Sequence, residues 1–164
     1  MRPALGAALL VLSFGVQAQV GIVTRVADGD TLWVRVEEAG PGAGKRSPKP
    51  LKVRLLGIDA PERCQAWGPQ AKAALEARVL NRRVHLQGRA SDDYQRRLAR
   101  LELDGEDIAA WMVEHGHAWN SHFRRHTGAY AAQERAARAA RRGLFADRAA
   151  IEPRQFRKAH GPCS

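Results

Sequence analysis

The segment RLLGIDAPE, from Arg54 to Glu62, places one cation and two carboxylates along a short apolar run. The guanidinium of Arg54 is costly to bury in an apolar strand unless an acid pairs with it. Pro61 restricts the preceding residue to an extended backbone, which can leave the carbonyl of Ala60 free as a ligand. Hydrolysis of a phosphodiester needs such groups: a cation site, an arginine that meets developing charge, and a carboxylate such as Glu62 that takes a proton from water.

Two further acids, Asp28 and Asp30, lie in the segment ADGDT and are two residues apart, so an extended backbone can project both in the same direction. Together with Asp59 they would repel one another unless a cation lies between them. Ca²⁺ prefers oxygen ligands of this kind, and Mn²⁺ or Mg²⁺ could replace it in the same ligand set. The alternative is that Asp28 and Asp30 are ordinary turn residues, and DGDT considered alone favours that interpretation.

A pair of arginines, Arg96 and Arg97, begins another predicted strand close after Asp92 and Tyr94. Two arginines that converge on a bound cation would form a clamp for a phosphate group, because guanidinium forks match its oxygens. Each arginine alone could instead be a solvated charge at a strand edge. The acids and arginines together predict catalysis, since a non-catalytic nucleic-acid-binding OB-fold module, which is the main alternative, would need no Glu62.

A small domain, with its strands early and most of its helices late, must position these residues. β-Branched and aromatic residues and Asp-Gly turn signals predict five strands: two within 20–38 joined at Asp28-Gly29, and others at 51–58, 82–88 and 96–105. Helical periodicity and terminal Pro or Gly residues predict three helices, at 68–80, 106–116 and 128–143. Residues 39–50 read as a long hairpin loop. This order fits an α+β domain whose five strands could close into an OB-type barrel.

The motifs, taken in order, resemble the staphylococcal nuclease family. The matching segments are ADGDT (27–31), VRLLGIDAPE (53–62), GPQAKAALEARVL (68–80), DDYQRRLARLELDG (92–105), AWMVEHGHA (110–118) and ARRGLF (140–145). The resemblance implies an α+β fold, a five-stranded OB-fold β-barrel with three α-helices. It also implies a thermonuclease-like endonuclease that hydrolyses the phosphodiester bonds of DNA and RNA with Ca²⁺ and little sequence specificity.

The resemblance also assigns a metal site. It places Asp30, Asp59 and the backbone oxygen of Ala60 at the positions of the metal ligands, and Asp28 at that of an acid that acts through water.

The same resemblance assigns the groups that act on the substrate. Arg54 and Arg96 match the two phosphate-binding arginines, and Glu62 matches the proposed general base. Tyr94 matches an aromatic residue of the nucleotide pocket, and His122 stands roughly where a second pocket tyrosine is expected.

The first eighteen residues have the pattern of a secretory signal peptide: a positive start, an apolar core too short to span a bilayer, and small residues at the end. We therefore expect an exported protein, periplasmic or secreted, with a nuclease-like domain at 19–146 and a basic C-terminal extension at 147–164. An oxidising location would permit a disulfide between Cys64 and Cys163, although two unpaired thiols are the open alternative.

The formal net charge of +10 favours an acidic partner. Nucleic acid, DNA or RNA, is the partner that the acids and arginines indicate. We expect the protein to be a monomer and not to bind a membrane. An exported protein whose basic surface binds membranes or glycans is the remaining alternative.

Overall fold

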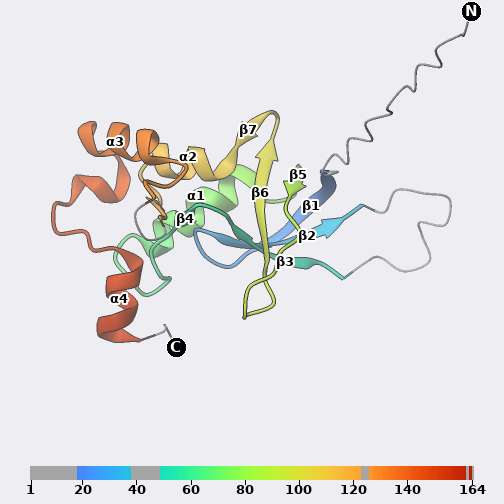
Figure 1. Cartoon of the computed structure of the whole chain (residues 1–164), viewed down its shortest axis with the longest axis horizontal. Helices are drawn as coiled ribbons and strands as arrows, with labels where there is room; N and C mark the ends of the chain where they lie inside the picture. Colours follow the sequence, from blue (N-terminus) through green and yellow to red (C-terminus); the bar gives the residue numbers. More distant parts are fainter. Residues whose placement is uncertain (1–17, 38–48, 123–125, 162, 164) are drawn as a thin grey trace, which may run out of the picture.

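The five long strands pair in a closed circuit in the computed structural model, which describes residues 18–37, 49–122, 126–161 and 163 (Figure 1). They are β1 (Gln19–Val26), β2 (Thr31–Val36), β3 (Leu51–Leu55), β5 (Arg83–Gln87) and β6 (Arg97–Leu103). Neighbours pair antiparallel in the order β3, β2, β1, β5, β6, and a parallel pairing of β3 with β6 closes the barrel. The predicted α+β class with a five-stranded OB-type barrel is confirmed.

Alternation of side chains explains why these segments form the barrel wall. In β5, Val84 and Leu86 are buried while the residues beside them are exposed, and in β6 Ala99, Leu101 and Leu103 are buried. Successive side chains of a strand point to opposite faces, so each strand gives every second residue to the core.

Two short strands hold one of the predicted acids beside the barrel. β4 (Ile58–Asp59) pairs antiparallel with β8 (Trp119–Asn120), and the side chain of Ile58 is buried in the main core. The backbone of Asp59 is therefore fixed on both sides, by the buried Ile58 and by its ladder partner Trp119.

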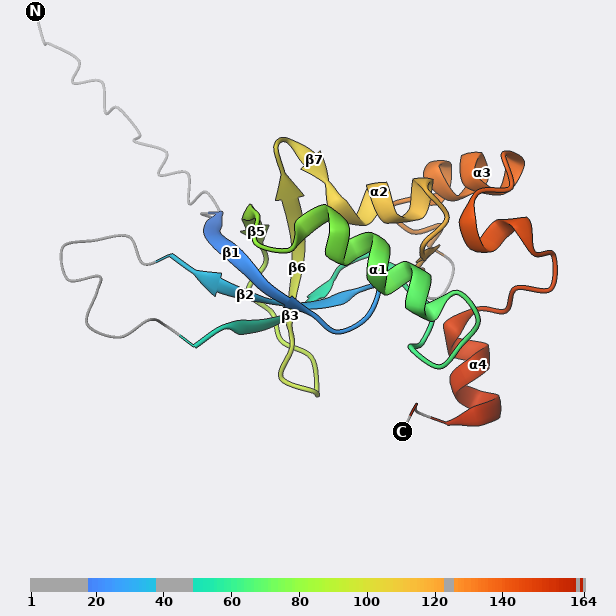
Figure 2. The same ribbon diagram turned by 180° about the vertical axis from the view of Figure 1, so that it is seen from behind.

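The three predicted helices are present as α1 (Gly68–Val79), α2 (Ile108–Glu114) and α3 (Ala131–Ala139). Figure 2 shows α1 alongside β1 and α2. The second helix begins later than predicted, because residues 106 and 107 pair with β6 as β7 (Glu106–Asp107). The Asp107 side chain then accepts hydrogen bonds from the backbone N–H groups of Ala109 and Ala110, which is typical of an N-cap.

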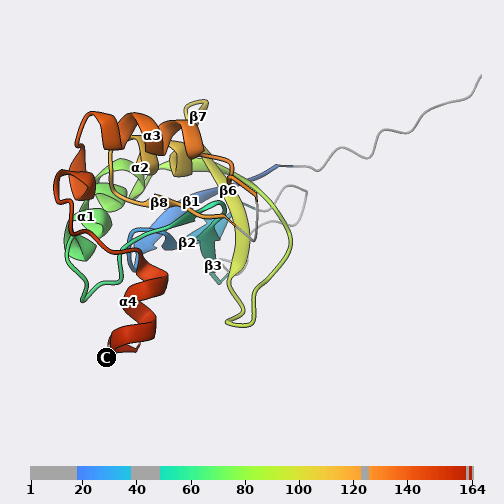
Figure 3. The same ribbon diagram turned by 60° about the vertical axis from the view of Figure 1, so that its left-hand side comes forward.

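A fourth α-helix, which was not predicted from the sequence, follows a short 3₁₀ turn, η1 (Gly143–Ala146). This helix, α4 (Pro153–His160), projects from the rest of the domain near the C-terminus (Figures 1 and 3). Within α4, all of whose residues the structure describes, Pro153 is the one buried residue. Packing alone therefore attaches α4 weakly.

Two predictions concern segments that the structure describes only in part. Residues 1–17 of the predicted signal peptide (1–18) and residues 39–48 of the predicted hairpin loop (39–50) lie outside the described ranges. These predictions stay predictions, as do the domain boundaries at 18/19 and 146/147. In the described part of the chain, no helix is long and apolar enough to cross a membrane.

Candidate active site

A cavity of about 380 Å³ brings most of the predicted site residues together. Its walls come from the β1–β2 turn, β3, β4 and the segment after it, the loop before β6, and α4. The predicted residues that line it are Asp28, Asp30, Arg54, Asp59, Ala60, Glu62, Tyr94 and Arg96. Lys52 and Arg157, which were not predicted, line it as well.

The guanidinium of Arg54 joins two of the predicted metal-ligand carboxylates. Its Nη1 lies 2.7 Å from Asp30 Oδ2, and its Nη2 lies 3.0 Å from Asp59 Oδ1. Burial acts to lower the pKa of Arg54, but the charges of Asp30 and Asp59 outweigh burial, and the pKa is raised. Arg54 is thus a permanent cation, and its acid partners explain why it can lie in an apolar strand.

Asp30 ties the β1–β2 turn to the segment that follows β4. Its Oδ1 accepts a hydrogen bond from the Thr31 hydroxyl at 2.9 Å, and its Oδ2 accepts one from the backbone N–H of Ala60 at 3.0 Å. Gly29 permits this close approach, because a Cβ at that position would lie 2.7 Å from the Cβ of Ala60 and 2.9 Å from that of Ala71. The glycine of the DGDT motif therefore has a steric role.

Burial makes negative charge costly in this cavity. Burial, followed by the charge of Asp30, raises the pKa of Asp28 to about 6. Burial also raises the pKa of Asp59, although its hydrogen bonds with Arg157 act in the opposite direction. A cation bound near these carboxylates would favour their charged forms and offset the cost of burial.

The atoms of this cavity that could act as metal ligands are oxygens. Among the described residues, no group of three or more acidic, histidine or cysteine side chains is arranged to hold a metal ion unaided. The carboxylates of Asp30 and Asp59, with the carbonyl of Ala60 and water, would supply the oxygen ligands that a hard divalent cation prefers. The residues present therefore fit such a cation when water completes its coordination.

The second predicted arginine is held by an acid from its own loop. Arg96 Nε donates to Asp92 Oδ2 at 2.8 Å, and Asp92 Oδ1 accepts from the backbone N–H groups of Tyr94 and Arg96. The Arg96 guanidinium lies 5.2 Å from the centre of the Tyr94 ring, and Tyr94 is 77% exposed. The loop therefore presents a cation together with an aromatic face open to a ligand.

A third arginine, from α4, contacts the predicted general base. Arg157 Nη1 donates to Glu62 Oε1 at 2.6 Å, and Arg157 Nη2 donates to Asp59 Oδ2 at 3.0 Å. Burial acts to lower the pKa of Arg157, but the hydrogen bonds with Asp59 and Glu62 outweigh burial, and the pKa is raised. The cavity therefore balances its four acids with cations from β3, from the loop before β6 and from α4.

Residues 52–147 match the sequence profile of a family described as "Staphylococcal nuclease homologue". The chain belongs to the staphylococcal nuclease family. An uncharacterized endonuclease of Haemophilus influenzae is 36% identical over 136 residues, covering 83% of this chain and 71% of the relative. A micrococcal nuclease of Shigella flexneri is 33% identical over 171 residues (97% of this chain, 92% of the relative), and Protein ParB of Escherichia coli is 34% identical over 170 residues (96% and 90%).

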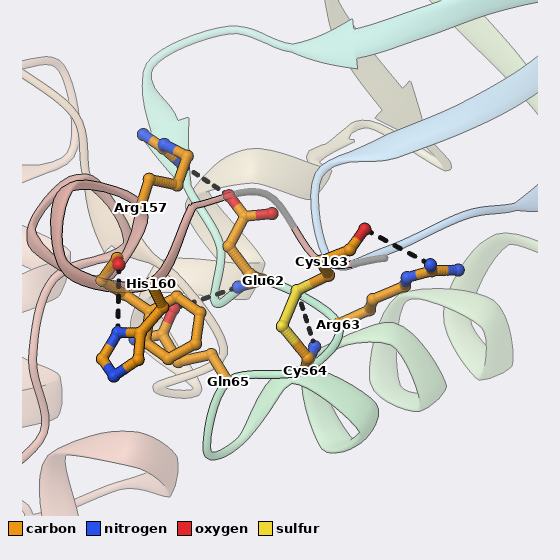
Figure 4. Close-up of a disulfide and its surroundings, with 8 residues drawn as sticks. Glu62, Arg63, Cys64, Gln65, Arg157, His160 and Cys163 are labelled. Atoms are coloured by element: carbon orange, nitrogen blue, oxygen red, sulfur yellow. Dashed lines mark hydrogen bonds and ion pairs between the residues drawn. A yellow bond between two sulfur atoms is a disulfide. The ribbon is translucent and has the colours of Figure 1, made fainter.

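The arginine from α4 lies beyond the part of the chain that matches the family profile, which ends at residue 147. A disulfide between Cys64 and Cys163 links the end of this segment to the loop that follows Glu62 (Figure 4). The sequence alone left the pairing of the two cysteines open, and residues 147–164 were predicted only as a basic extension. The cysteine pair was the available signal, because it joins a residue close to Glu62 to one close to Arg157.

One residue that the staphylococcal nuclease resemblance assigned to the substrate pocket lies elsewhere. His122 lines a different cavity, together with Asn120, His126, Glu134 and Arg135. The structure therefore does not bring His122 to the cavity that holds the acids and arginines.

Proposed function

We propose that this protein is an exported, Ca²⁺-dependent endonuclease that cleaves DNA and RNA with little sequence preference. Its membership of the staphylococcal nuclease family and its endonuclease relatives make it a nuclease hydrolase. The observation that carries the finer proposal is the contact of Arg54 with both Asp30 and Asp59, in a cavity that also holds Glu62 and Arg96.

In this proposal the two arginines bind and stabilise the scissile phosphate. Arg54 and Arg96 are each held in place by carboxylates. Their remaining N–H donors are therefore already positioned for a phosphate and need little reorganisation during the reaction. Guanidinium groups can bind phosphate oxygens in pairs, and they stabilise the extra negative charge of the transition state.

Glu62 is proposed as the general base. Its Oε1 accepts from Arg157, whereas no donor from the described residues reaches Oε2. Oε2 can therefore accept a proton from a water molecule as that water attacks phosphorus. By the family resemblance, the bond to the 5′-oxygen breaks, and the chain that ends in a 3′-phosphate is left.

Asp30, Asp59 and the Ala60 carbonyl are proposed to hold the divalent cation, with Asp28 acting through water. When bound, this cation would polarise a phosphoryl oxygen and neutralise part of the developing charge. Mn²⁺ or Mg²⁺ could bind the same oxygens.

The proposed breadth of substrate follows from the kinds of group in the cavity. Arginines recognise phosphate, and the exposed Tyr94 ring can stack on any base, so neither contact reads sequence. The net charge of +10 adds general attraction to nucleic acid. The signal-like first eighteen residues and the disulfide support export.

A cleavage assay tests the proposal. The purified protein without its leader is incubated with single-stranded DNA or RNA in millimolar Ca²⁺ or in a chelator. We expect cleavage with Ca²⁺, none with the chelator, and strong loss in Glu62→Gln and Arg54→Ala. Arg35→Ala is the matched control, because Arg35 is exposed on β2 and has no ion pair with any described residue. A gel shift without cleavage by the folded protein would instead support the non-catalytic OB-fold module.

A further inference from the structure

The C-terminal helix brings a charged group to the candidate active site from beyond residues 52–147, the part of the chain that matches the family profile. Three hydrogen bonds link the Arg157 guanidinium to the acids: one with Glu62 Oε1 and one with each oxygen of Asp59, at 2.6–3.3 Å. The side chain is 40% exposed, so the group faces solvent as well as the acids.

The disulfide is the covalent attachment of the C-terminal segment beside the cavity. A second cavity, of about 340 Å³, lies between α4 and the domain and is lined by Trp67, Trp119, Phe156 and His160, among others. Apart from the three Arg157 hydrogen bonds, polar contacts between this segment and the domain are few. Gln65 Nε2 donates to the Ile151 carbonyl at 2.8 Å. The Cys64 amide and the Arg63 side chain lie close to Cys163 (Figure 4). Without the disulfide, little apolar burial would keep Arg157 in place.

The contacts of Arg157 indicate that it orients Asp59 and Glu62 and does not block them. A carboxylate has about four lone-pair sites, and Arg157 and Arg54 together occupy three on Asp59, leaving one on Oδ2. On Glu62, Arg157 takes Oε1 and leaves Oε2 without a donor from the described residues. One guanidinium therefore fixes both carboxylates and leaves an oxygen of each accessible.

We propose that Arg157 is a positioning residue for phosphodiester cleavage, which orients Glu62 and Asp59, and that the Cys64–Cys163 disulfide keeps it there. This inference rests on the proposed function, since it needs Glu62 to be the base and Asp59 to be a metal ligand. A dithiol reductant would transfer two electrons and two protons to the S–S bond, giving two thiols and an oxidised dithiol. α4 would then be free to leave, and the rate of cleavage would fall.

The test compares variants of the full chain. They are Arg157→Ala, Arg157→Lys, the double variant Cys64→Ser/Cys163→Ser, and the double variant combined with Arg157→Ala. Arg154→Ala is the matched control, because Arg154 lies on the same helix, is exposed, and has no ion pair with any described residue. Steady-state cleavage of a single-stranded oligonucleotide gives kcat and KM for each protein.

Misplacement of a catalytic group should reduce kcat, so we expect Arg157→Ala to lower kcat by roughly 10- to 100-fold. KM should change by less than about threefold, because the lost contacts orient protein groups and do not bind substrate. Arg157→Lys should restore part of the rate, since an ammonium can keep one of the contacts. The double cysteine variant should lose a similar factor, and Arg157→Ala should add no further loss in that background.

Hydrogen exchange supplies a readout that does not depend on activity. At short labelling times, deuterium uptake by residues 153–160 should rise in the double cysteine variant by more than uptake by the barrel strands does. A folded Arg157→Ala protein with kcat within about twofold of the unaltered protein, or above it, overturns the inference. Unchanged kcat in the double cysteine variant overturns the role of the disulfide.

The proposed function can fail separately. If the unaltered protein cleaves and Arg157→Ala cleaves equally well, only the inference about Arg157 is lost. If the unaltered, folded protein cleaves neither DNA nor RNA, the proposed function fails and this inference falls with it.

Discussion

Thr31 and Arg54 are backbone partners in the β2–β3 ladder, and this register brings the Arg54 guanidinium to 2.7 Å from Asp30, the residue before Thr31. The barrel therefore assembles two distant sequence motifs, DGDT and RLLGIDAPE, through ordinary strand pairing. A shift of one residue in this pairing would turn Arg54 to the opposite face of the sheet and separate it from its acids.

Asp30→Ala should destabilise the protein and abolish cleavage. The change leaves the N–H of Ala60 without its buried acceptor and removes one of the two carboxylates that form ion pairs with Arg54. Removing one partner of a buried ion pair costs about 3–5 kcal/mol, and we expect about 2–3 kcal/mol here because Asp59 still pairs with Arg54. Urea denaturation in a chelator measures the loss, and a change below about 1 kcal/mol would contradict this account of the site.

Stability should depend on pH through Asp28. Burial raises the pKa of this acid from 3.8 to about 6, so the folded protein binds its proton more tightly than the unfolded chain does. The contribution of Asp28 to the free energy of unfolding is present below about pH 4 and is lost as the pH rises through about 6, by about 3 kcal/mol.

The comparison with Asp28→Asn isolates this effect. In a chelator, the unaltered protein should lose stability relative to Asp28→Asn as the pH increases from 4 to 7, and added Ca²⁺ should reduce the difference. Parallel pH curves for the two proteins would show that Asp28 has an ordinary pKa in the folded state.

Loss of the disulfide should also lower global stability. Cys64 and Cys163 are 99 residues apart, and a link over that length removes up to about 4–5 kcal/mol of chain entropy from the unfolded state. The urea midpoint of the double serine variant should fall accordingly. A midpoint equal to that of the oxidised protein would mean that the link does not restrict the unfolded chain.

Tyr94→Ala should weaken substrate binding without unfolding the protein. The ring is 77% exposed, so its removal costs little packing, whereas stacking on a base contributes about 1–3 kcal/mol to binding. Binding of a single-stranded oligonucleotide, measured in a Glu62→Gln background, should weaken for alanine and be retained for Tyr94→Phe. Equal affinities for all three proteins would exclude stacking on this ring.

Local patterns predicted the barrel well because its strands carry their own signals. The alternation of Val84 and Leu86 in β5 is visible in the sequence, and the Asp-Gly turns mark where strands reverse. The closure of the barrel by β3 and β6 carries no such signal, since it is a pairing between distant strands, and the family resemblance supplied it.

The part of the site that sequence reasoning missed depends on long-range contacts. Glu62 and Arg157 are 95 residues apart, and neither has a neighbour that indicates the other, apart from the two cysteines. The helix itself could have been predicted from Pro153 at its start and Gly161 after its end. His122 was assigned by approximate position in the family pattern, and the residue itself lines a different cavity.

The covalent link between the tail and the loop after Glu62 has a consequence for when the enzyme becomes fully competent. The barrel strands and the segments next to them hold the cavity acids, Arg54 and Arg96, and neither cysteine lies in a barrel strand. A newly made chain in a reducing compartment would then carry Arg157 on an untethered tail. The full rate of cleavage would be reached only where an oxidant has formed the disulfide. The nucleic acids of the cell that synthesised the protein would then be cleaved more slowly.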